Sequence, residues 1–256
     1  NYLRNQVMPL LRERWPAFTS RWQQTAELCA TNEALIDELA AQDLQLADLQ
    51  SAFVGTSINL TYVESLSQAR RHNLLRLWLR EQGLATPEQQ HLQQIEQQLI
   101  GGRQDAEAQV TWGDVSLRVY RQRMFALPLI VLPSASAQNL PVTVSTDTTV
   151  VNLPQHFRLT FEWRDISSAP LLKQGLPNLH VRFRVGGERC RPAGRAHSQT
   201  LKRLLQDYGV EPWLRDSLPL IYSDNTLVAV ANLWICEGYQ AEAEGYCLKY
   251  ELIPKT

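Results

Sequence analysis

The basic residues between Arg182 and Arg203 are the side chains whose type and spacing most clearly suggest chemistry. Seven of these 22 positions carry Lys or Arg and one carries an acid, Glu188, whereas the 256-residue chain has a formal net charge of -1. Concentrated positive charge can dock a polyanion, because each neutralised phosphate releases condensed counterions. A mixed-charge surface that gathers its arginines without any ligand is the alternative. The basic residues are Arg182, Arg184, Arg189, Arg191, Arg195, Lys202 and Arg203.

The pattern of the same segment predicts the elements that would position these side chains. Residues 181–185 alternate apolar and basic side chains, which predicts a strand that buries the valines and Phe183 and turns its arginines outward. A Gly-Gly turn and a loop follow, and we expect a helix to begin at Ser198. Backbone N–H groups at that helix start, beside Arg195 and Lys202, would form a seat for a phosphate.

Residues able to catalyse a reaction are few. The chain has no GxSxG, HExxH, P-loop or GxGxxG motif, and its four cysteines show no metal-ligand spacing. His197 and Ser198 would support a hydrolase, although a Ser at a helix start usually caps it. Asp216 would serve as a general base, but a pair with Arg215 that locks a turn against Trp213 is the reading we favour. The sequence therefore predicts no catalytic, cofactor or metal site.

The remaining pattern predicts the fold class and the domains. Hydrophobic periodicity changes from 3.6 to 2 residues near residue 128, which indicates an α+β protein: a helical N-terminal part with a β-hairpin, then a β-rich α+β C-terminal domain. We expect a helical linker over 1–43, a first domain over 44–127 and a second over 128–256. The longest apolar run, 125–132, is too short to cross a bilayer, so we expect a cytoplasmic protein without membrane contact.

Several elements are specific enough to be tested. Expected helices cover 1–15, about 19–49, a stretch capped by Ser65 and Gln68 and ending at Gly83, and a stretch from Thr86 to Gly101. Expected strands include a hairpin over 108–119 that turns at Gly113-Asp114, and the segments 157–163, 227–235 and 246–252. We also expect a turn at Asp224-Asn225, and Leu92 and Ile95 to face inward from the helix that begins at Thr86. The second helix should pack one apolar face made of Trp22, Ala26, Cys29, Ile36 and Leu39.

One motif brings a resemblance. The pattern G-R-x(5)-LK-x(6)-GV-x-PWLRD-x-x-PL, which runs from Gly194 to Leu220, resembles the C-terminal domain of bacterial tRNA(Ile)-lysidine synthetases. Upstream, ARRHNLLRLWLREQG and the hairpin into Arg118–Arg121 are similar to the central, substrate-recognition domain of that family. The resemblance covers essentially the whole chain and is strongest at PWLRD.

The resemblance implies an activity whose catalytic domain is not found in this sequence. The family uses ATP, with Mg, and lysine to convert the wobble cytidine of CAU-anticodon isoleucine tRNA to lysidine, on an N-terminal domain with an SGGxDS loop. No SGGxDS occurs here, and Asn1 as first residue agrees with a fragment. We therefore expect the tRNA-recognition part of an ATP-dependent C–N ligase, inactive alone, with its own N-terminal catalytic domain as partner and a homodimer left open.

The resemblance also implies tRNA-binding residues. Arg195, Lys202, Arg203 and Arg215 lie on or beside the motif, and Trp213 would stack on a base or, equally well, plug the core. Less direct candidates are Arg182, Arg184, Arg70, Arg71 and Arg103. The alternative function is a protein-interaction or structural module whose basic face meets acidic protein surface and has no RNA role.

Overall fold

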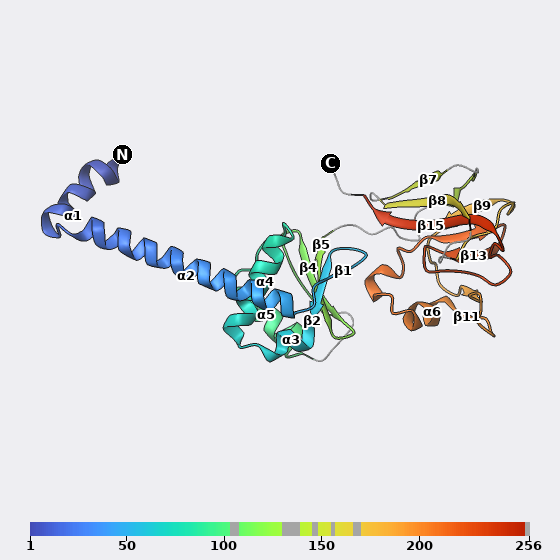
Figure 1. Ribbon diagram of the computed structural model, residues 1–256, viewed down its shortest axis with the longest axis horizontal. Coiled ribbons are helices and arrows are strands. Elements are labelled where there is room, and N and C mark those ends of the chain that lie inside the picture. Colours follow the sequence, from blue (N-terminus) through green and yellow to red (C-terminus); the bar gives the residue numbers. More distant parts are fainter. Residues whose placement is uncertain (103–107, 130–138, 145–147, 155–156, 166–169, 254–256) are drawn as a thin grey trace. The chain divides into compact units, whose positions relative to one another are not determined.

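The chain divides into two compact units, Asn1–Leu127 and Pro128–Thr256 (Figure 1). The structure is a computed structural model, and it describes residues 1–102, 108–129, 139–144, 148–154, 157–165 and 170–253. Each unit combines helices with antiparallel strands, so the α+β class predicted from the sequence is confirmed.

The first unit begins with a helical arm. A π-helical turn (η1, Leu3–Val7) leads into α1 (Met8–Arg14), and the long α2 spans Phe18–Leu46. The apolar face expected to be packed is instead exposed along most of α2, with Trp22 at 63% and Ile36 at 50%. The reason is that α4 meets only the last part of α2, where Asn73 donates to the Ile36 carbonyl at 2.6 Å.

Four further helical segments form the helical layer of the first unit: α3 (Leu60–Ser65), α4 (Gln68–Glu81), α5 (Gln89–Ile95) and the π-helical η2 (Glu96–Ile100). The caps differ from those expected. Ser67 rather than Ser65 precedes α4, and the Ser65 hydroxyl donates to the Tyr62 carbonyl. Helix α5 begins after Glu88, which forms a capping box with His91, rather than at Thr86.

The first unit also holds a five-stranded antiparallel sheet in the order β1-β2-β5-β4-β3. The hairpin expected over 108–119 is confirmed, with Trp112 opposite Val115, but it is one edge of this larger sheet. Gly55 shapes the turn between β1 and β2: its φ is +72° and an added Cβ would lie 2.0 Å from the Ala126 carbonyl oxygen. The strands are β1 (Gln50–Ser51), β2 (Thr56–Asn59), β3 (Gln109–Trp112), β4 (Val115–Tyr120) and β5 (Arg123–Pro128).

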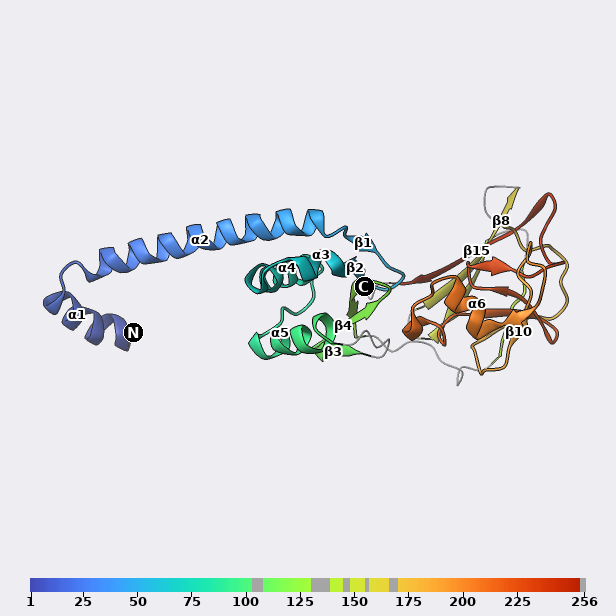
Figure 2. The same cartoon turned by 90° about the horizontal axis from the view of Figure 1, so that it is seen from below.

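The core of the first unit lies between the helices and this sheet (Figure 2). Trp78 of α4 is fully buried there, and its indole N–H donates to the Thr56 hydroxyl at 3.0 Å, which satisfies the polar atom of a core side chain. Leu92 and Ile95 of α5 are also fully buried, as expected from their spacing.

The second unit contains two larger antiparallel sheets, ordered β14-β13-β12-β9-β6 and β15-β8-β7. The expected strand 227–235 is in fact two strands that reverse at Ala231, which has a φ of 41°. Strand β9 ends at Arg182, so Val185 is 81% exposed instead of buried. The strands are β6 (Leu140–Pro141), β7 (Thr149–Leu153), β8 (Phe157–Asp165), β9 (Leu179–Arg182), β12 (Leu220–Ser223), β13 (Thr226–Val230), β14 (Trp234–Ile235) and β15 (Glu244–Leu252).

Aromatic side chains from β8 and β15 fill the core of the second unit. Phe161 packs edge-on against Tyr246, and Phe157 stacks on Tyr250, whose hydroxyl donates to the buried Ser217 carbonyl at 2.8 Å. Within the described ranges of both units, no helix combines the length and the apolar character needed to span a membrane.

Candidate nucleic-acid interface

The basic segment is built on a short two-stranded ribbon and the helix that follows it. Strand β10 (Arg189–Cys190) pairs antiparallel with β11 (Gln199–Thr200), and α6 (Leu201–Asp207) begins directly after β11. Figures 1 and 2 both show the ribbon beside α6. The loop 191–198 closes the ribbon, so the basic side chains of the loop and of α6 come from one local structure.

Glu188 ties the entrance of the ribbon to the preceding turn. Its Oε1 accepts from the N–H groups of Val185 at 2.6 Å and Gly186 at 2.9 Å. Burial raises the pKa of this carboxyl, but the backbone donors and nearby Arg184 outweigh that effect and hold the pKa below its usual value. Glu188 therefore stays ionised near neutral pH, where it is the acid built into the basic segment.

The prediction of a phosphate-binding site at a helix that starts at Ser198 is wrong. Ser198 opens no helix, because residues 199 and 200 pair with β10 and α6 starts only at Leu201. The N–H of Leu201 already donates to the Glu188 carbonyl at 2.8 Å. The helix has seven residues, and its first donor is not available to a ligand.

Lys202 and Arg203 are the most accessible candidates. Both are exposed on α6, whose opposite side buries Leu201, Leu204 and Leu205. Neither forms an ion pair within the part of the chain that the structure describes. Their charges are thus held on a fixed helix and open to solvent, which is the condition for contact with a phosphate.

Arg195 is held in place beside this helix. Its guanidinium lies 3.2 Å from the Asp207 carboxylate and 5.2 Å from the centroid of the Tyr208 ring. The side chain remains 35% exposed, so part of the guanidinium can still meet a ligand. Arg189, which the motif did not select, is also exposed, and only its place in the basic run pointed to it.

Two other arginines of the segment are engaged by neighbours. Arg184 lies 2.8 Å from the Asp216 carboxylate and is 18% exposed. The guanidinium of Arg182 sits over the ring of Tyr222, 4.7 Å from its centroid. Asp216 is therefore the partner of Arg184, which is a different pairing from the one expected with Arg215.

The PWLRD motif forms a bend that packs on its own chain. Pro212–Leu214 is a 3-10 turn (η4), and the Nε of Arg215 donates to the Val210 carbonyl at 3.0 Å. Trp213 and Arg215 are each partly buried. Trp213 and Arg215 thus pack on the turn and still keep some surface that a ligand could contact.

The candidates in the first unit have strong internal contacts. Arg71 makes a bidentate pair with Glu96, at 2.9 and 2.7 Å, and is 17% exposed. Arg70 is bound to the Asp43 carboxylate, which is itself buried and accepts from the Tyr62 hydroxyl. Arg103 lies outside the described residues.

The acidic partners reduce the charge surplus that the sequence suggested. Four acids face the seven basic side chains of the segment: Glu188 from within it, and Asp207, Asp216 and Glu237 from other positions. What remains is a modest positive patch centred on Arg189, Lys202 and Arg203, which we call the α6 patch.

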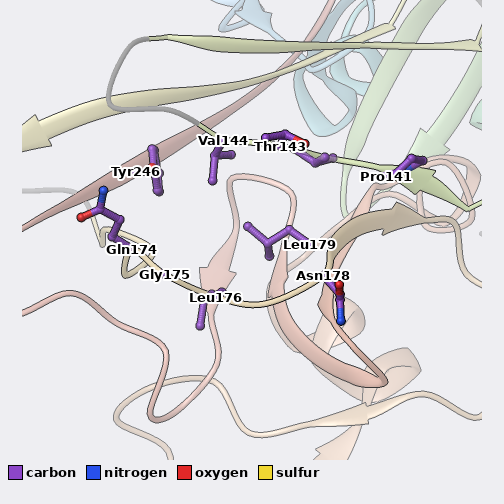
Figure 3. Close-up of a pocket in the computed structure, with 10 residues that line it drawn as sticks. Pro141, Thr143, Val144, Gln174, Gly175, Leu176, Asn178, Leu179 and Tyr246 are labelled. Carbon is purple, nitrogen blue, oxygen red and sulfur yellow. The ribbon is translucent and has the colours of Figure 1, made fainter.

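A cavity of about 610 Å³ lies elsewhere in the second unit, between β15 and the segment that precedes β9 (Figure 3). Gln174, Asn178 and Tyr246 line it, and none of its described lining residues is charged. It offers nothing to neutralise a phosphate. Over the described ranges, no group of three or more His, Cys, Asp or Glu side chains is placed to hold a metal ion.

Comparisons with known proteins match both units. The family model described as "TilS substrate binding domain" matches residues 59–125, and "TilS substrate C-terminal domain" matches residues 179–252, which include the whole α6 patch. The tRNA(Ile)-lysidine synthase of Serratia proteamaculans is 35% identical over 243 residues, and that of Coxiella burnetii is 31% identical over 263.

The coverage of these matches is unequal. The alignments take in 94% and 99% of this chain but 52% and 55% of the two relatives, so the chain spans about half the length of the curated relatives it matches. A solved structure titled "Crystal structure of TILS C-terminal domain" aligns with 46% of this chain and 100% of its own, at 16% identity and a TM-score of 0.35.

Proposed function

We propose that this chain, which carries the substrate-binding and C-terminal domains of the TilS family, is the part of a tRNA(Ile)-lysidine synthase that holds the tRNA. The observation that carries the proposal is the α6 patch: exposed cations on α6 and on the adjoining strand β10, inside the residues that match the TilS substrate C-terminal domain. Double-stranded RNA presents mainly phosphates and 2′-hydroxyls to a protein, so a small cationic surface on a rigid element suits its recognition.

In this proposal the residues of the second unit have separate tasks. Lys202, Arg203 and Arg189 contact phosphates directly. Arg195 approaches from the side, oriented by Asp207, so that less side-chain freedom is lost on binding. The remaining candidates, which border the patch or shape its support, are Arg182, Arg184, Arg215 and Trp213.

The candidates of the first unit have a different task. Arg70 and Arg71 hold helices together and act on the tRNA only through the surface they stabilise. We assign the chemical step, which in the family consumes ATP and lysine, to the half of the relatives that this chain does not span. The contribution of this chain is therefore binding and orientation of the CAU isoleucine tRNA.

The test is binding of the chain to two unmodified transcripts, CAU isoleucine tRNA and elongator methionine tRNA, over a salt series. The two share an anticodon, so any preference has to come from the rest of the tRNA. The proposal predicts binding that weakens steeply with salt, with a slope of log affinity against log salt of roughly -2 to -4, as expected for a few phosphate contacts.

Preference for the isoleucine transcript would place discrimination in these two domains, and equal binding would make them a general tRNA clamp. Affinity no better than that of a neutral control protein at low salt would contradict the proposal. That result would favour a module whose basic face meets an acidic protein surface.

A further inference from the structure

Two cysteines meet beneath the basic ribbon. Cys190 is in β10 and Cys236 follows β14, and their exposed fractions are 6% and 3%. The two segments run antiparallel: Pro192 pairs with Cys236, and the Glu237 N–H donates to the Arg191 carbonyl at 2.8 Å. Two thiols that are separated by 45 residues of chain are thus brought onto neighbouring strands.

The two thiols differ in their readiness to ionise. The Cys236 side chain holds the pKa of Cys190 below its ordinary value, although burial opposes the effect. The Cys190 side chain, together with burial, raises the pKa of Cys236. Two neighbouring thiols can divide the tasks of attacking an oxidant and resolving the product.

A cavity gives small molecules access to the pair. It has a volume of about 310 Å³, and both cysteines line it together with Arg189 and Arg191. Glu237 lines it as well and pairs with Arg191 at 3.9 Å. The other two cysteines lack this setting, since Cys29 is exposed on α2 and Cys247 lies in β15.

We propose that Cys190 and Cys236 are a peroxide-sensitive thiol pair that closes reversibly to a disulfide. The Cys190 thiolate attacks one oxygen of hydrogen peroxide, the O–O bond breaks, and a sulfenic acid and a hydroxide ion form. The Cys236 thiol then attacks that sulfur, the S–O bond breaks, and the hydroxyl leaves as water with the thiol proton. Overall, two thiols lose two electrons and two protons, and one peroxide becomes two waters.

The disulfide would fasten the ribbon to β14 by a covalent bond, where hydrogen bonds such as Ala193 N–H to the Ile235 carbonyl, 3.0 Å, now hold it. The basic loop would then be less free to move. This inference does not depend on the proposed tRNA role, because the thiol chemistry can be measured without RNA.

The experiment uses the full chain with Cys29→Ser and Cys247→Ser, so that only the pair remains. After brief exposure to hydrogen peroxide, free thiols are counted with a thiol reagent and the intact mass is measured before and after dithiothreitol. We expect the thiol count to fall from two to zero with the loss of two hydrogens, restored by the reductant. The melting temperature should rise on oxidation, because the cross-link restricts the unfolded chain.

A matched variant adds Cys236→Ala, which removes the resolving thiol. Peroxide should then give a sulfenic acid at Cys190 that dimedone traps, whereas the two-cysteine chain should give little dimedone adduct. Two free thiols after peroxide treatment, or a disulfide that joins two chains instead of closing within one, would overturn the proposal.

Discussion

Lys202 and Arg203 differ from Arg195 and Arg184 because no acidic side chain in the described structure neutralises them. Arg195 has Asp207 and Arg184 has Asp216 as partners. A cation that is already paired releases fewer counterions when a phosphate arrives. The contribution of each cation to tRNA binding should therefore depend more on whether it has an acidic partner than on its position in the motif.

Replacement of single cations tests this ranking. Lys202→Ala should weaken tRNA binding and reduce the salt slope by about one unit, as expected for one lost phosphate contact. Arg195→Ala should reduce the slope by less, because Asp207 already neutralises part of its charge. The measurement is a tRNA titration at several salt concentrations, and equal slopes for wild type and Lys202→Ala would remove Lys202 from the interface.

Arg71 and Arg80 lie on the same helix, and their ion pairs differ in how far they are buried. Arg71 is bidentate to Glu96 in a half-buried setting, whereas the pair of Arg80 with Asp37 is about half exposed. Arg71→Ala should lower the free energy of unfolding by roughly 2–3 kcal/mol, as for hydrogen bonds to charged groups. Arg80→Ala should cost less than about 1 kcal/mol.

Urea unfolding followed by far-UV circular dichroism measures both arginine variants, because most helices lie in the first unit. Equal losses of stability in the two would show that burial does not separate these pairs.

His72 gives the first unit a pH dependence. Burial lowers the pKa of its imidazole in the folded state, although Glu96 opposes the shift. On acidification the unfolded chain therefore takes up this proton first, near its ordinary pKa of about 6.5. Stability should fall as the pH drops below that value, and His72→Gln should flatten this part of the stability–pH curve. An unchanged curve in the variant would contradict the assignment.

At the scale of elements, α2 carries apolar side chains that its own unit does not cover. Trp22 is 63% exposed, whereas Trp78 of α4 is fully buried. Trp22→Ser should change the free energy of unfolding by less than about 0.5 kcal/mol. Trp78→Ala should cost about 3–5 kcal/mol, because it leaves a cavity and an unpaired Thr56 hydroxyl. A large effect of Trp22→Ser in urea unfolding would mean that α2 is covered in solution.

The elements that the sequence predicted correctly are those with local causes. Gly113-Asp114 and Asp224-Asn225 turn the chain between alternating segments, and the structure has a hairpin at each place. The burial of Leu92 and Ile95 followed in the same way from helical spacing. Turn chemistry and periodicity act within a few residues, so they can be read without a structure.

The features that the sequence did not predict depend on contacts with residues elsewhere in the chain. Periodicity marks the apolar face of α2 but not what covers it. Helix α6 begins at Leu201 and not at the predicted Ser198, because residues 199 and 200 pair with β10 as a strand. The acids that pair with the basic segment, Asp207, Asp216 and Glu237, lie downstream in the chain, so the surplus of charge looked larger than it is.

At the scale of the whole chain, each compact unit contains one region that matches a TilS domain. In the first unit Arg70, Arg71 and Arg80 join α4 to neighbouring helices, whereas in the second unit Arg189, Lys202 and Arg203 are exposed on the ribbon and α6. We therefore propose that the second unit supplies the electrostatic part of tRNA binding. Charge changes in the two units should have different consequences.

The most direct measurement compares two charge-reversed variants of equal net charge for binding to CAU isoleucine tRNA: Lys202→Glu/Arg203→Glu in the α6 patch and Arg12→Glu/Arg14→Glu, which are exposed on α1. We expect the first variant to lose affinity by roughly tenfold or more at moderate salt, with a slope reduced by about two, and the second to stay close to wild type. Equal losses in both variants would mean that net charge alone governs binding, and would contradict a site on α6.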